Sequence, residues 1–233
     1  MSLPGYVAGL PRVSTSVTAT HRIIFRQGDW LSDLAGGKII SGLYSRDTGN
    51  TGDLDVLRAG LLMGKRTSGG LYAPSIIGLS NAAYAAGATT LTLTAAAVTE
   101  ITRRIGASGT FRIVGPPGAA GVIAEEEVTY SALPTTTTAT ITALNNSYIS
   151  GSFIMANDGS QDILSVIPDG YGIKVTDTDG TTNLDVPFAQ MPIAGVLISA
   201  NILLWPSDAS LREWLVSEMS KHGQGKFVFD HHY

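Results

Sequence analysis

The sequence predicts a mainly β protein of the α+β class, with one helix near the carboxyl terminus and a β-rich segment inserted in mid-chain. Short extended segments alternate with turns rich in glycine and aspartate. Only 15% of the residues are charged, whereas roughly 25% is typical of soluble proteins. Threonine, alanine, glycine and serine replace the missing charges. At 233 residues, the chain can form one large β domain or a domain that carries a smaller second one.

The most informative stretch is residues 56–74, VLRAGLLMGKRTSGGLYAP. Residues 61–63 form a short apolar run, and residues 67–70 (TSGG) supply the residue types that a tight reversal needs. Residues 71–73 then resume an extended segment, which Pro74 closes. The pattern predicts a strand, a turn and a second strand. No acid, base or nucleophile stands there in a useful arrangement, so we interpret the hairpin as scaffolding.

Further extended segments are expected on both sides of this hairpin. Residues 30–34 have scattered apolar positions and indicate a looser region, and residues 157–160 (NDGS) form a turn. The expected strands lie at residues 21–25, 38–44, 152–155, 163–167, 172–176, 183–186, 193–204 and 226–230.

Residues 81–150 are rich in alanine and threonine, and they are predicted to form an inserted, self-contained β-rich subdomain with one helix. We expect the strands that flank the insertion to pair without it. Residues 95–105 have helical spacing and end before Gly106. Val98, Ile101 and Ile105 are expected to face one way, and Thr99, Arg103 and Arg104 mostly outward. The expected strands of the insertion lie at residues 89–94, 110–114, 122–130 and 138–143.

A second helix is predicted after residues 205–208 (WPSD). Ser210 and Glu213 have the spacing of a capping box, which predicts that the helix begins at Ser210. Gly223 is expected to end it. The apolar face of this helix consists of Leu211, Trp214, Leu215 and Met219.

Charge and composition bear on the partners. The net charge of −4 provides no broad positive field, so direct nucleic-acid binding is not expected. No window approaches the ~20 apolar residues of a membrane span, and the amino terminus lacks the pattern of a secretory signal. With no cysteine, the chain has neither disulfides nor thiolate chemistry.

Candidate catalytic and metal sites are sparse. Asp230, His231 and His232 invite a metal interpretation, but adjacent histidines on a strand point to opposite faces. The polar loop at residues 45–55 and the segment around residues 177–180 could hold calcium, yet neither matches an EF-hand, and turn-rich loops are the alternative. None of the common catalytic or phosphate-binding motifs is present. We therefore expect no enzyme activity, metal or cofactor.

Three segments occur in a fixed order: AGLLMGKRTSGGLYAP, then NDGSQ, then PIAGVLI. This ordered set resembles the head decoration, or capsid cement, proteins of tailed bacteriophages. In the lambda-like type, a segment similar to AGT-LGK-T-G-Y-P precedes a DGS turn and an A-GIL strand. The closing segment, WPSDASLREWL followed by GKFVFDHHY, looks like a longer branch of that family. The resemblance covers residues 45–80 and 152–233, so the inserted segment departs from the compact pattern.

The resemblance implies a small β-barrel or β-tulip-like domain, formed here by residues 21–80 and 151–233, that assembles as a homotrimer. Such a trimer sits at local threefold positions on the outer surface of the expanded capsid and stabilises the major capsid protein lattice. The protein would be made in the host cytoplasm and end in the virion. Residues 1–20 would be an arm that reaches the shell by strand addition. The implied contacts are Val13, Thr15, Val17, Ile23 and Phe25.

Two other functions remain open from the sequence. A tail or baseplate β protein would show longer, repeated strands. A carbohydrate-binding or hydrolytic β domain would need a cluster of exposed aromatic side chains or a pair of carboxylates. Trp205 and Trp214 are better explained by packing around the carboxy-terminal helix, which leaves Trp30 uncommitted.

Overall fold

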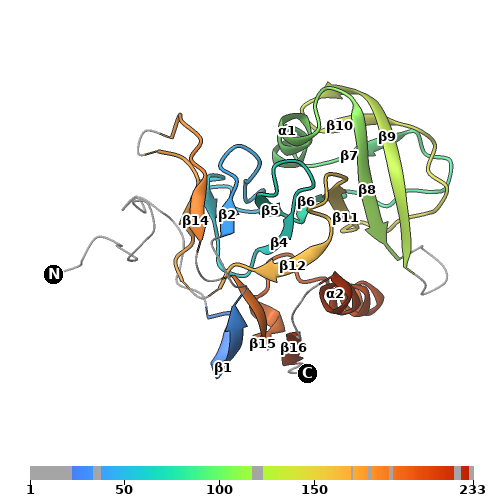
Figure 1. Cartoon of the computed structure of the whole chain (residues 1–233). Helices are drawn as coiled ribbons and strands as arrows, with labels where there is room; N and C mark the ends of the chain where they lie inside the picture. Colours follow the sequence, from blue (N-terminus) through green and yellow to red (C-terminus); the bar gives the residue numbers. More distant parts are fainter. Residues whose placement is uncertain are drawn as a thin grey trace.

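The computed structural model describes residues 23–33, 38–116, 123–168, 170–177, 180–188, 191–222 and 227–230. It confirms the mainly β class: the described residues form sixteen strands, two α-helices and one 3-10 helix. The strands are arranged in four sheets, which are mostly antiparallel. The described strands form no closed barrel. Figure 1 shows strands β8, β9 and β10 of the inserted segment at the upper right and strands β1, β15 and β16 at the bottom.

The central hairpin lies in a five-stranded sheet, whose strands in spatial order are β12 (Ile163–Val166), β4 (Leu62–Lys65), β5 (Tyr72–Pro74), β2 (Lys38–Ile40) and β14 (Val186–Phe188). β4 pairs antiparallel with β5, with Gly64 opposite Ala73. The predicted strand-turn-strand unit is therefore confirmed. β14 begins where the expected strand at residues 183–186 was to end, because Asn183 forms only an isolated bridge with Thr176.

The inserted segment shares a six-stranded sheet with its flanks, in the spatial order β6 (Ile76–Leu79), β11 (Phe153–Ala156), β8 (Gly109–Gly115), β9 (Ala124–Thr135), β10 (Thr138–Ile141) and β7 (Thr90–Thr92). The flanking strands β6 and β11 do pair directly, as expected, with Phe153 opposite Leu79. However, β8 pairs along the other side of β11. One core cluster also joins Ile77 and Ile154 to the side chains of the insertion. The inserted segment is thus built onto the flanking strands rather than packed by itself.

Two small sheets complete the fold. β3 (Val56–Leu57) pairs with β13 (Ile173–Lys174). The other sheet has three strands, with β15 (Pro192–Ile198) between β1 (Phe25–Asp33) and β16 (Phe227–Asp230). β1 extends through residues 30–33, where a looser region was expected, because it pairs along β15 from far away in the chain. β15 is shorter than expected, since the 3-10 helix η1 (Ser199–Asn201) follows it.

The two helices are α1 (Ala95–Arg104) and α2 (Ala209–His222). The apolar face of α2 is confirmed, since Leu215 and Met219 are buried in the core beneath it. The expected cap at Ser210 is wrong. The carboxylate of Asp208 accepts a hydrogen bond from the Leu211 amide at 2.9 Å, so Asp208 is the N-cap residue of α2. Ser210, which the capping-box spacing predicts as the cap, lies within the first turn of α2.

Candidate functional site

The three segments that carry the family resemblance meet in space. Thr67, in the turn of the hairpin, donates its amide to the Asp158 carbonyl at 2.8 Å. β12, which follows the DGS turn, pairs with β4 of the hairpin. The Ser165 hydroxyl on β12 donates to the carbonyl of Pro192, the first residue of β15, at 2.6 Å. The hairpin, the turn and the PIAGVL strand therefore form one connected unit.

Two glycines allow the hairpin and the DGS turn to approach this closely. A Cβ atom at Gly64 would overlap the backbone carbonyl oxygen of Ser160. Gly159 has φ +98°, and a Cβ atom there would lie 2.5 Å from the Thr67 amide nitrogen. Both positions therefore require glycine, one for space and the other for space and backbone conformation.

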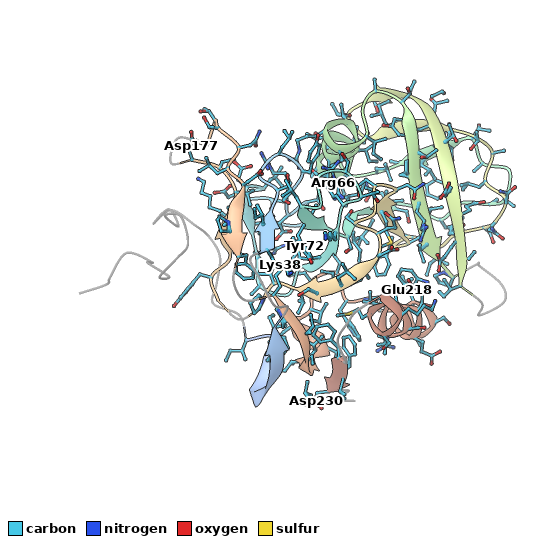
Figure 2. The ribbon with its side chains drawn as sticks, viewed as in Figure 1. Lys38, Arg66, Tyr72, Asp177, Glu218 and Asp230 are labelled. Atoms are coloured by element: carbon cyan, nitrogen blue, oxygen red, sulfur yellow. The ribbon has the colours of Figure 1, made fainter. Side chains whose placement is uncertain are left out.

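The carboxylate of Asp158 is the centre of a largely buried ion cluster, in which the Asp158 side chain is 14% exposed. Arg66 donates its Nε to Asp158 Oδ2 at 2.8 Å. Arg104 donates Nη2 to both carboxylate oxygens at 3.1 Å. The Ser160 hydroxyl and amide donate to Oδ1 at 2.6 and 3.1 Å. Figure 2 shows Arg66 near the middle of the molecule, between the hairpin sheet and α1.

Arg104 connects the inserted segment to this cluster. Its side chain is 0% exposed, and its Nη1 donates to the Pro74 carbonyl at 2.7 Å. The expectation that Arg104 faces outward is therefore wrong. The helical spacing contains the missed signal: Arg104 lies three residues after Ile101 and seven after Ala97, both of which are fully buried. The charge of Arg104 favours a surface position, whereas its place on the helix beside Ala97 and Ile101 predicts burial.

Three further contacts extend the cluster. Arg103 hydrogen-bonds to the Leu43 carbonyl and to the carboxylate of Glu100, which is itself buried. The guanidinium of Arg66 lies 3.5 Å from the ring centroid of Tyr44, within the range of a cation–π contact. One turn of α1 thus contacts the loop after β2, the end of the hairpin and the DGS turn. Because its cations and carboxylates are directed at one another, the arrangement ties distant segments together.

The ion pairs of Asp158 make the folded protein less stable in acid. Burial by itself would raise the pKa of Asp158, but Arg104, Ser160 and Arg66 together lower that pKa from 3.8 to about 2. A carboxyl with a lowered folded-state pKa contributes stability that is present above pH 3.8 and is lost as the pH falls toward 2. We expect the wild type to lose about 2 kcal/mol through this group over that window.

Urea unfolding at pH 6 and pH 2.5 measures this loss. Asp158→Asn should be less stable at pH 6 and should show a smaller decrease between the two pH values than the wild type. Equal decreases in the two proteins would contradict a lowered pKa for Asp158.

The predicted capsid-contact residues fall into two groups. Val13, Thr15 and Val17 lie outside the described residues. Ile23 is 52% exposed, whereas Phe25 is 3% exposed and belongs to the core beneath the three-stranded sheet. Of the two described residues, Ile23 leaves its side chain open to solvent, whereas Phe25 packs into the core at the start of β1. Their contact with a capsid stays a prediction.

The loop proposed as a possible calcium site has a different arrangement. Asp47 is bound by Arg58 through two nitrogens, at 2.6 and 3.0 Å. Asp55 pairs with Arg46 at 2.6 Å. These carboxylates therefore hold turns in place, as the alternative interpretation proposed. Within the described ranges, no three or more His, Asp or Glu side chains group closely enough to hold a metal. His231 and His232 lie outside those ranges.

Comparison with known proteins adds no relative: no family model, no curated protein and no solved structure matches the chain. In the part of the chain that the structure describes, no helix has the length and apolar character needed to cross a membrane.

Proposed function

We propose that this protein is a head decoration protein, a structural protein that binds the outer surface of an expanded phage capsid and stabilises its lattice. The observation that carries the proposal is the meeting of the three resemblance segments. Residues from positions 64, 158 and 192 are far apart in the sequence, yet they belong to one hydrogen-bonded unit. This convergence supports the proposal, because segments that match one fold in the same order should also be neighbours in space. In this proposal the hairpin unit is the β-tulip-like body and residues 81–150 are an addition to it.

The proposed mechanism is binding without catalysis. The arm at residues 1–20 adds as a strand to a neighbouring capsid subunit, where main-chain hydrogen bonds give affinity and alternate side chains set the register. Val13, Thr15 and Val17 supply that alternation, and Ile23 continues it to the body. In a homotrimer, the first bound arm raises the effective concentration of the other two, so that modest contacts hold firmly. Because the protein binds only the assembled shell, it stabilises that state by mass action.

Co-sedimentation with purified, expanded and undecorated capsids from the same source tests this proposal. We expect saturable binding at three copies for each local threefold position, and loss of binding when residues 1–20 are deleted. If binding survives the deletion, the proposed function stands, but the capsid contact lies in the folded body rather than in residues 1–20. Absence of binding by the full chain would contradict the function and favour a tail component or a glycan-binding domain.

A further inference from the structure

Strands β15 and β16 of the three-stranded sheet have one buried face and one open, largely apolar face. Its inward side chains, Phe25, Leu197, Phe227 and Phe229, belong to the core beneath α2. Because side chains alternate along a strand, the intervening residues of β15 and β16 point the other way. Val196 and Val228 are direct cross-strand neighbours on this outward face, and Ile198 follows Val196 on the same strand. Asp230, opposite Ile198, is the one charged residue of β15 and β16 on this face and lies at its edge, where β16 ends. We call Val196, Ile198 and Val228 the outward apolar face.

This face is open to solvent in the single chain. Val228 is 58% exposed, and Val196 and Ile198 are partly exposed. Ile23 lies beside the face, since the Ile198 amide donates to the carbonyl of Ile24, the next residue, at 2.8 Å. Contiguous exposed apolar surface is a common mark of a protein interface. Among the described residues, five large apolar side chains are exposed: Ile23, Ile39, Leu43, Tyr171 and Val228. Two of the five, Ile23 and Val228, lie at this sheet.

The outward apolar face lies where the amino-terminal segment joins the body. The 22 residues before Ile23 are outside the described part and lead into β1, an outer strand of the same sheet. Fully extended, they could span at most roughly 80 Å. Figure 1 shows β1, β15 and β16 together at one end of the molecule, away from strands β8, β9 and β10 of the inserted segment. Figure 2 places Asp230, the last residue of β16, at that same end.

The sheet of the inserted segment has a different surface. Thr92 on β7, Thr129 on β9 and Thr140 on β10 are exposed. Thr90 is opposite Thr140 in the β7–β10 pair, so hydroxyl groups line neighbouring strands. None of the five exposed large apolar side chains of the described residues lies on this sheet. Its surface suits continued contact with water more than burial against a protein.

We propose that the outward apolar face packs against an apolar surface of the major capsid protein. The three-stranded sheet then faces the shell, and the inserted segment projects away from it. This orientation rests on the proposed function, and it lets the body and the arm engage the same neighbouring subunits. The capsid protein is favoured over other occupants because the arm, which the proposed function directs to the shell, leaves the body at the rim of this face.

Three glutamate variants test the orientation by capsid co-sedimentation of the full chain. Val228→Glu places a charge in the proposed interface, and we expect it to weaken binding by more than about tenfold. Thr140→Glu is the matched control, an exposed strand position on the inserted segment, and should bind within about twofold of the wild type. Ile39→Glu alters an exposed apolar residue of the five-stranded sheet and should also bind normally. Far-UV circular dichroism and thermal unfolding establish that each variant is folded, and light scattering establishes that each keeps the oligomeric state of the wild type. Loss of that state by Val228→Glu would assign the face to contacts between copies and overturn the orientation.

The outcomes are separable. Wild-type binding by Val228→Glu would overturn the orientation and leave the proposed function intact. A loss confined to Ile39→Glu would move the docking face to the five-stranded sheet, and a loss confined to Thr140→Glu would place the inserted segment against the shell. If the wild type itself does not bind, the proposed function fails and the orientation fails with it.

Discussion

Replacing Arg104 with methionine is expected to lower the free energy of unfolding by about 3 kcal/mol, at the lower end of the range for breaking a buried ion pair. The side chain is fully buried and donates to Pro74, Asp158 and Ser160. Its loss leaves the Asp158 carboxylate with Arg66 as its remaining cation and leaves the Pro74 carbonyl without that donor. For a chain of this size, the decrease corresponds to a melting temperature roughly 6–12 °C lower.

Arg112→Met is the matched control, because Arg112 also lies in the inserted segment but pairs with Glu125 at 3.6 Å on a partly exposed surface. We expect that variant to change stability by less than about 1 kcal/mol. Urea unfolding of both variants at neutral pH gives the comparison. Similar stabilities for the two would show that the Arg104 cluster does not hold the inserted segment to the body.

Gly64→Ala is expected to destabilise the fold by about 3 kcal/mol, the upper part of the usual range for overpacking. The added methyl group would overlap the Ser160 carbonyl oxygen and lie 2.5 Å from the Asp162 carbonyl oxygen. Both contacts are backbone atoms, one in the DGS turn and one two residues after it, so no side-chain rotation relieves them. The turn must move away from the hairpin, which also stretches the hydrogen bond from Thr67 to Asp158.

Gly87→Ala separates this clash from the ordinary cost of replacing glycine. Gly87 has φ +87° with no neighbouring atom within 4 Å of a Cβ. Its substitution should therefore cost only about 1–2 kcal/mol for the left-handed backbone. In thermal and urea unfolding, we expect the wild type to be the most stable protein, Gly87→Ala to be less stable, and Gly64→Ala to be the least stable. The reverse order for the two variants would contradict close contact between the hairpin and the DGS turn.

Local features of the fold were predictable from the sequence. The β4–β5 hairpin follows from the TSGG turn between two short apolar runs, and both helices follow from the spacing of their apolar residues. These features depend on residues that are neighbours in the chain. The cap of α2 was less certain, because Asp208 and Ser210 are both good capping residues and only the backbone path distinguishes them.

Features that depend on distant partners were missed. β1 is a strand through Asp33 because β15 lies beside it, and nothing near Trp30 in the sequence indicates that pairing. Arg104 is buried because Asp158, 54 residues later, lies next to it. A charged residue on a helix is usually exposed, and a buried partner reverses that preference only once the fold brings the two together. The candidate site was therefore visible as separate motifs but not as one cluster.

Cryo-electron microscopy of expanded capsids saturated with the full chain tests whether the protein binds the outer capsid surface as a trimer. We expect trimeric density at the local threefold positions of the outer surface, with the three-stranded sheet toward the shell and the inserted segment outermost. Empty threefold positions at saturating protein concentration would contradict this expectation.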